Sequence, residues 1–277
     1  MKQVNLLTDS PRRLFFHYLG PTIGSSMVTS IYILADTIMV GQGVGDAGLA
    51  ALTIFMPIVA SFFALGLLLG VGGGVLMSVA KGSGNESLAH KYFSTAMISA
   101  AVVSVCFAVF GAIFFDPMMY ALGADTTNIE LVRGYGLCYT VSAPLFIFSS
   151  SLQSFIRNDK SPRHAMIAVL TGSGLNILLD YLFIFVFKMG MFGASFATSI
   201  GTSITVIHFF TKKNTMRFSF RFFSIKALWE IAKCGFSSFL IECANAVLVF
   251  VFNHTLLKYI GSVGVTVYSI MSNVAVV

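Results

Sequence analysis

The stretch from Ala51 to Ala80, ALTIFMPIVASFFALGLLLGVGGGVLMSVA, contains 30 residues and no charged side chain. A membrane-spanning α-helix needs about 20 consecutive apolar residues, so this stretch is long enough to cross a bilayer. Its glycine cluster, Gly70–Gly74, lacks the strand–helix context of a nucleotide-binding loop and is typical of close contact between helices in a membrane. The stretch therefore predicts an integral membrane protein.

The composition of the whole chain leads to the same class. Of the 277 residues, 56% are hydrophobic and 10% are charged, whereas about 25% charged residues is usual in a soluble domain. No HExxH or GxSxG motif is present, so we do not expect an enzyme. The four cysteines form no Cys-x-x-Cys pair, so neither a disulfide framework nor a zinc site is indicated, and we expect no resident cofactor. The net charge is +6, and most charged residues lie in polar connectors between apolar runs, so the expected partner is the lipid bilayer, not nucleic acid.

Six further apolar runs predict an all-α membrane protein. The seven expected spans are Leu14–Val40, Ala51–Ala80, Phe93–Phe115, Leu131–Gln153, Ala165–Phe187, Phe192–Phe210 and Cys234–Tyr259. An eighth begins near Val263, and the chain ends inside it at Val277. We therefore expect a piece of a longer protein.

The longest polar connector, Thr211–Lys233, separates six spans from the spans that follow. It divides the chain into a six-helix N-terminal lobe (residues 1–211), a cytoplasmic linker between lobes (residues 212–233) and the truncated start of a C-terminal lobe (residues 234–277). Six spans per lobe is an even number, so both lobes would enter the membrane with the same orientation. That arrangement is the parallel type of internal repeat found in transporters.

The basic residues predict the orientation. Of the 17 Lys and Arg residues, 14 lie in the N-terminal segment or in the connectors after the second, fourth and sixth spans. The other three, Arg133, Lys188 and Lys258, lie on the opposite side. Because cytoplasmic loops carry the excess of Lys and Arg, we expect a multi-pass protein of the cell membrane with a cytoplasmic N-terminus.

Three carboxylates lie inside apolar runs: Asp36, Asp180 and Glu242. An ionisable side chain at the centre of a bilayer costs about 3 kcal/mol or more, so such residues are rare and usually functional. At about 1.5 Å per residue, Asp36 and Asp180 lie roughly 7–11 Å below the outer surface. The alternative for both is an interfacial acid that reaches the outer headgroups. Glu242 is interpreted as a functional acid of the second half.

Polar side chains from other spans accompany the first two acids. Asn176 lies four residues before Asp180 on the same helix face, Thr198 lies at a similar depth in the sixth span, and Tyr135 enters from the fourth. Their oxygens suit Na⁺, and a desolvated carboxyl pair readily shares a proton. The sequence thus predicts a proton or Na⁺ site at Asp36, Asn176, Asp180 and Thr198. The alternative for Asn176 and Thr198 is hydrogen bonding between helices.

At these residues the sequence resembles the multidrug and toxic compound extrusion (MATE) family. The run Ile31–Ile54, IYILADTIMVGQGVGDAGLAALTI, is similar to the first-span signature, in which an acid precedes a short glycine-rich outer turn. The run Leu175–Gly201, LNILLDYLFIFVFKMGMFGASFATSIG, resembles the Asn-x3-Asp fifth span and the Ala-Thr sixth span. Tyr135 with Pro144 resembles the fourth span, and Cys234–Asn253 resembles the seventh.

This resemblance implies a fold of twelve spans in two six-helix lobes, of which the chain holds the N-terminal lobe, the seventh span and part of the eighth. It implies export of lipophilic, cationic drugs in exchange for H⁺ or Na⁺ by a monomer. The residues that match the coupling site and the substrate cavity are Asp36, Asn176, Asp180, Thr198, Tyr135 and Glu242. One acid cluster holding both the ion and the cationic drug would leave excess positive charge in a low dielectric, which favours exchange.

Other interpretations stay open. A lipid-linked oligosaccharide flippase of similar architecture needs basic residues to hold pyrophosphate, and no Lys or Arg lies well inside the seven complete spans. A seven-span receptor would have its N-terminus outside, against the distribution of basic residues. A third alternative is a non-transporting fragment, since alternating access between two lobes requires both of them.

Overall fold

The computed structural model describes residues 10–159, 161–211 and 216–261, together with Gly264, Val267, Tyr268 and Met271. Across these described residues the chain is helical and contains no strand. The prediction of an all-α protein is therefore confirmed.

The helices are α1 (Pro11–Gly43), α2 (Asp46–Gly82), α3 (Glu86–Ile113), α4 (Phe115–Ala121), α5 (Ile129–Val141), α6 (Ala143–Asn158), α7 (Pro162–Tyr181), α8 (Gly190–Thr211) and α9 (Ile225–Tyr259). The π-helix η1 (Leu182–Val186) continues α7, and the 3₁₀ turn η2 (Phe220–Phe222) precedes α9.

Six of the described helices are long and apolar enough to cross a membrane, and the bent pair α5–α6 would form a seventh span. The axes of α5 and α6 differ by 55°. The break falls at Ser142, and Pro144 follows in the first turn of α6, where its missing N–H costs no helical hydrogen bond. The expected fourth span is thus two helices at an angle, and the chain is a multi-pass membrane protein.

Near the C-terminus the structure differs from one expectation and leaves another outside the described residues. Helix α9, which contains the expected seventh span, begins at Ile225 and not at Cys234. It begins there because Ser224 caps it by accepting a hydrogen bond from the Ala227 N–H. Apolar residues then recur at helical spacing from Ile225 to Cys234, although the average hydropathy of this stretch is low. The expected eighth span from Val263 lies outside the described residues, apart from the four single positions named above.

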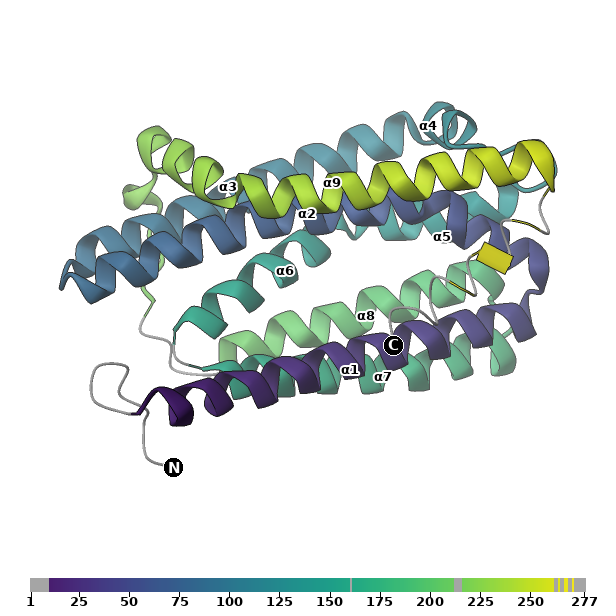
Figure 1. Cartoon of the computed structure of the whole chain (residues 1–277). Helices are drawn as coiled ribbons and strands as arrows, with labels where there is room; N and C mark the ends of the chain where they lie inside the picture. Colours follow the sequence, from purple (N-terminus) through teal and green to yellow (C-terminus); the bar gives the residue numbers. More distant parts are fainter. Residues whose placement is uncertain are drawn as a thin grey trace.

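The helices form two groups with α5 and α6 between them (Figure 1). Helices α2, α3 and α9 run together on one side, and α1, α7 and α8 run together on the other. The middle helices join the groups, because α6 packs against both α2 and α8, and α5 packs against both as well.

Glycines in α2 set how closely its neighbours approach. A Cβ on Gly72 would lie 2.2 Å from the Ile231 carbonyl oxygen of α9, and one on Gly70 would lie 2.7 Å from Cα of Ser151 in α6. On α9, a Cβ on Gly235 would lie 2.0 Å from the Leu68 carbonyl oxygen. Only glycine fits at such contacts, so the expected role of the cluster Gly70–Gly74 in helix packing is confirmed.

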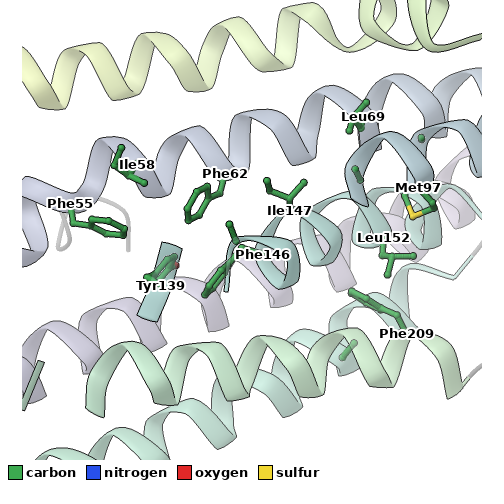
Figure 2. Packing of buried hydrophobic residues seen from close by; sticks show 14 of the residues in the cluster. Phe55, Ile58, Phe62, Leu69, Met97, Tyr139, Phe146, Ile147, Leu152 and Phe209 are labelled. Atoms are coloured by element: carbon green, nitrogen blue, oxygen red, sulfur yellow. The ribbon is translucent and has the colours of Figure 1, made fainter. Parts of the chain in front are cut away.

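Aromatic rings fill the space between α2 and the middle helices (Figure 2). Tyr139 of α5 stacks on Phe146 of α6 with ring centroids 4.1 Å apart. Phe62 of α2 stacks on Tyr139 at 6.0 Å, and Phe55 meets Tyr139 edge to face at 5.6 Å. These buried rings form an aromatic wall between α2 and the middle helices.

Candidate functional site

Asp36 and Asp180 lie next to each other at the contact between α1 and α7. Their carboxyl groups are close enough to interact electrostatically. Asp180 has no exposed surface, and Asp36 is partly exposed although its Oδ1 atom is buried. The structure thus brings together two acids that are 144 positions apart in sequence.

The segment directly after Asp180 shapes this contact. The helix changes there from α to π geometry over Leu182–Val186, and such single-turn π segments are frequent at functional sites. The end of α1 passes close to this turn, since a Cβ on Gly43 would lie 2.1 Å from Cγ2 of Ile184. The missing side chain of Gly43 therefore lets α1 approach η1 just beyond the acid pair.

Asn176 and Thr198 join the site from α7 and α8. The Asn176 amide donates a hydrogen bond to the Thr198 hydroxyl over 3.3 Å, and that hydroxyl donates to the Ala194 carbonyl over 3.0 Å. One turn away, a Cβ on Gly172 would lie 2.6 Å from the Gly201 carbonyl oxygen. This glycine contact holds the two helices close enough for the amide and the hydroxyl to meet.

The site is rich in acceptors and poor in donors. Both carboxylate oxygens of Asp180, Oδ1 of Asp36 and Oδ1 of Asn176 are buried and accept no hydrogen bond from any described residue. A buried acceptor without a donor costs about 1–3 kcal/mol. A proton shared by the carboxyl groups satisfies two of these oxygens, and a small hard cation can contact several of them. The residues present therefore fit either H⁺ or Na⁺.

Three tyrosines lie near enough to interact electrostatically with the acids. Tyr135, almost fully buried on α5, interacts electrostatically with Asp36 and Asp180. Tyr32 of α1 interacts with the same two acids, and Tyr139 interacts with Asp36. Sequence reasoning identified Tyr135 and missed the other two tyrosines. Helical spacing could have found them, because Tyr32 lies four residues before Asp36 and Tyr139 lies four residues after Tyr135.

A cavity of about 150 Å³ adjoins the acid cluster between α1, α2, α6, α7 and α8. Asn176 and Thr198 belong to both the cluster and the cavity lining, as does Tyr32. The other polar lining residues are Thr29, Ser149, Ser150, Gln153, Ser173, Thr202 and Thr205. None of the lining residues is charged, and Phe63 and Phe146 supply aromatic surface. The cavity therefore offers hydroxyl and amide groups at the edge of the acid pair.

Glu242 does not join this cluster. It is half-buried on α9, and α9 packs chiefly against α2 and α3, whereas the cluster is built on α1, α5, α7 and α8. The interpretation of Glu242 as an acid of the second half stays a prediction.

Comparison with known proteins gives a consistent set of relatives. The model of the MatE family matches residues 21–182. The multidrug export protein MepA of Staphylococcus haemolyticus is 28% identical over 264 residues, which cover 93% of this chain and 58% of that protein. MepA of Staphylococcus saprophyticus is 29% identical over 262 residues, covering 92% of this chain and 57% of that protein. The chain thus spans just over half the length of these curated relatives.

Solved structures of similar fold agree with these relatives. An inward-facing multidrug resistance MATE transporter of the MOP superfamily superposes with a TM-score of 0.82 at 26% identity, covering 88% of this chain and 57% of that one. A MOP superfamily transporter from Pyrococcus furiosus superposes with a TM-score of 0.87 at 26% identity, covering 99% of this chain and 62% of that one. For the Pyrococcus furiosus transporter, the reversed polarity of its binding pocket suggests a different function.

Proposed function

Because the chain belongs to the MatE family, we propose that it forms the first half of an antiporter that exports lipophilic, cationic drugs across the cytoplasmic membrane in exchange for H⁺ or Na⁺. In this proposal residues 1–211 form the N-terminal lobe and residues 212–233 the cytoplasmic linker. Residues 234–277 begin a second lobe, and the complete transporter acts as a monomer with a cytoplasmic N-terminus. The curated relatives are named as multidrug export proteins, which supports the substrate class.

The observation that carries the proposal is the pairing of Asp36 with Asp180 in a site with surplus acceptors. Two adjacent carboxylates inside a membrane cannot both stay ionised without a neutralising charge. A proton, a Na⁺ ion or the cationic centre of a drug supplies that charge. Since occupancy by two of them would leave excess positive charge, binding of the ion favours release of the drug.

The aromatic wall supports the drug half of this exchange. Phe55, Tyr135 and Tyr139 pack against one another beside the acids, with ring centroids 5.5–5.7 Å apart. The faces of such rings attract organic cations, and their bodies bury apolar substituents. A lipophilic cation would therefore find both its charge and its apolar groups accommodated near the acid pair.

Coupling requires that the ion binds one conformation of the transporter better than the other. The acids lie where α1 meets α7, so a movement of α1 relative to α7 would change the distance between the carboxyl groups. Protonation or Na⁺ binding favours the conformation in which they are close. Through this difference in affinity the ion gradient drives export.

The flippase alternative gains no observation in its favour, because the described cavity lining contains no Lys or Arg to hold a pyrophosphate.

The test is substitution of Asp180 by Asn in the protein completed by its second lobe. We expect drug efflux from cells or vesicles to fall by at least about tenfold, because a neutral amide cannot exchange a cation. Asp46→Asn, an exposed acid at the start of α2, is the matched control and should leave efflux unchanged. Wild-type efflux by Asp180→Asn, at equal amounts in the membrane, overturns the proposal. Efflux driven by a proton gradient without sodium, or the reverse, identifies the ion.

A further inference from the structure

Residues 216–233, which we call the basic–aromatic segment, connect the described end of the linker to the first turns of α9. Four of its residues are basic: Arg217, Arg221, Lys226 and Lys233. All four are exposed. Nothing in the exchange mechanism uses these side chains, and they lie on elements that do not contribute to the acid cluster.

Helix α3 holds the backbone of this segment in place. The Ser94 hydroxyl donates a hydrogen bond to the Arg217 carbonyl over 3.3 Å and accepts one from the Ser219 N–H over 3.1 Å. The Thr95 hydroxyl donates to the Phe222 carbonyl over 3.3 Å. Ser94 and Thr95 have no exposed surface. The segment is thus fixed to the bundle before any ligand arrives.

The segment carries a clear excess of positive charge, with four basic residues and one acid. Its one acid is Glu230, and the Glu230 Oε2 atom accepts a hydrogen bond of 2.6 Å from the Tyr92 hydroxyl of α3. Glu230 is therefore engaged with the bundle, while the four basic side chains remain exposed. An anion that meets this surface is attracted by four positive charges and opposed by one carboxylate, which is turned toward Tyr92 of α3.

Large apolar side chains lie exposed among these charges. Phe220 and Ile225 are each 76% exposed, and Trp229 is 63% exposed. The Lys233 ammonium lies 5.2 Å from the centre of the Trp229 ring. Aromatic side chains with basic neighbours are typical of the boundary between lipid tails and headgroups, where one end of the ring is apolar and the other meets water.

The length of α9 places the segment at that boundary. With 35 residues, α9 is about 50 Å long at about 1.5 Å per residue. The hydrocarbon core of a bilayer is about 30 Å thick and the whole bilayer about 40–45 Å. One end of α9 must therefore extend into the headgroup layer. Its first turns lie at the same end of the bundle as the α2–α3 turn and the start of α1 (Figure 1), which is the end richest in basic residues.

We propose that the basic–aromatic segment is a binding surface for anionic phospholipid headgroups. The guanidinium and ammonium groups contact the lipid phosphates, and the exposed rings enter the upper part of the acyl layer. The surface anchors the connection between the two halves to one leaflet. This binding does not depend on transport, and it requires only that the chain lies in a membrane.

Trp229 is the single tryptophan of the chain, so its fluorescence reports on this surface alone. The full chain is reconstituted into mixed bilayers of phosphatidylcholine and phosphatidylglycerol. One of the two lipids carries bromine near the headgroup, at the same mole fraction in each case, because bromine quenches tryptophan on contact. We expect brominated phosphatidylglycerol to quench Trp229 at least about twofold more than brominated phosphatidylcholine. The excess should shrink as salt concentration rises.

The triple variant Arg217→Gln, Arg221→Gln, Lys226→Gln leaves the tryptophan and Lys233 in place. In this variant the excess quenching by brominated phosphatidylglycerol should shrink strongly, since only Lys233 remains to attract the anionic lipid. Lys258→Gln, an exposed basic residue at the other end of α9, is the matched control and should keep the excess. Equal quenching by both lipids in the unsubstituted chain overturns the proposal. So does an excess that survives both high salt and the triple substitution.

Discussion

The side-chain amide of Asn176 donates a hydrogen bond of 3.3 Å to the hydroxyl of Thr198 across the contact between α7 and α8. This bond uses one of the two N–H groups of the Asn176 Nδ2 atom, and the Asn176 Oδ1 atom has no donor among the described residues. Asp180 lies one turn further along the same face of α7. The hydrogen bond therefore orients an amide oxygen as an additional acceptor in the acid site.

Replacing Thr198 by Val should lower the free energy of unfolding by about 1–2 kcal/mol, because the buried Asn176 amide loses its acceptor. Thr198→Ser keeps the hydroxyl and should lose less. The measurement is denaturation of the purified chain in detergent, followed by circular dichroism. Equal stability of the Val and Ser variants would show that the hydrogen bond does not position Asn176.

Replacing Gly172 by Ala should push α7 and α8 apart. The added Cβ would meet Oγ1 of Thr205 and the Gly201 carbonyl oxygen, the latter at 2.6 Å, and overpacking of this kind typically costs about 1–3 kcal/mol. Gly174→Ala on the same helix is the matched control, since a Cβ there meets no atom within 4 Å. We expect Gly172→Ala to unfold at a lower temperature than Gly174→Ala. If Gly174→Ala unfolded at the lower temperature instead, the close glycine contact would be contradicted.

The proposed orientation places Arg221 in the cytoplasm and Lys188 outside. In a background without the four native cysteines, Arg221→Cys should react with a membrane-impermeant maleimide only after cells are permeabilised. Lys188→Cys, exposed between η1 and α8, should react in intact cells. Labelling of Arg221→Cys in intact cells would reverse the assigned orientation, and with it the direction of export.

Much of the site could be predicted from sequence because acids are costly inside apolar runs. That cost singled out Asp36 and Asp180, and the spacing of four residues added Asn176. Tyr32 and Tyr139 were missed, because a tyrosine in an apolar run looks like ordinary packing until its neighbours in space are known. Their proximity to the acids depends on how α1, α5 and α7 meet, which local pattern does not reveal.

The fold, like the site, could be predicted from the sequence only in part. Hydropathy located the spans, because the length of an apolar run reflects the thickness of the membrane. It did not reveal the bend between α5 and α6, since the average over a window is insensitive to a break at one residue, Ser142. It also missed the first turns of α9, because Lys226 and Lys233 lowered the average hydropathy over turns that are helical. The close packing of α9 on α2 joins residues far apart in sequence. The glycines indicated a close helix contact, but the sequence did not show which helices would meet there.

The central claim is that Asp36 and Asp180 act as one site that exchanges a cation for a drug. Every member of the cluster lies on α1, α5, α7 or α8, so the proposed competition between ion and drug at this cluster can be tested by binding. Binding of the lipophilic cation tetraphenylphosphonium to the purified chain is followed together with release of H⁺ or Na⁺ into a weakly buffered solution. The account predicts that about one cation leaves for each drug bound, and that none leaves in the Asp180→Asn variant. Drug binding without cation release in the unsubstituted chain, or undiminished release in the variant, would contradict it.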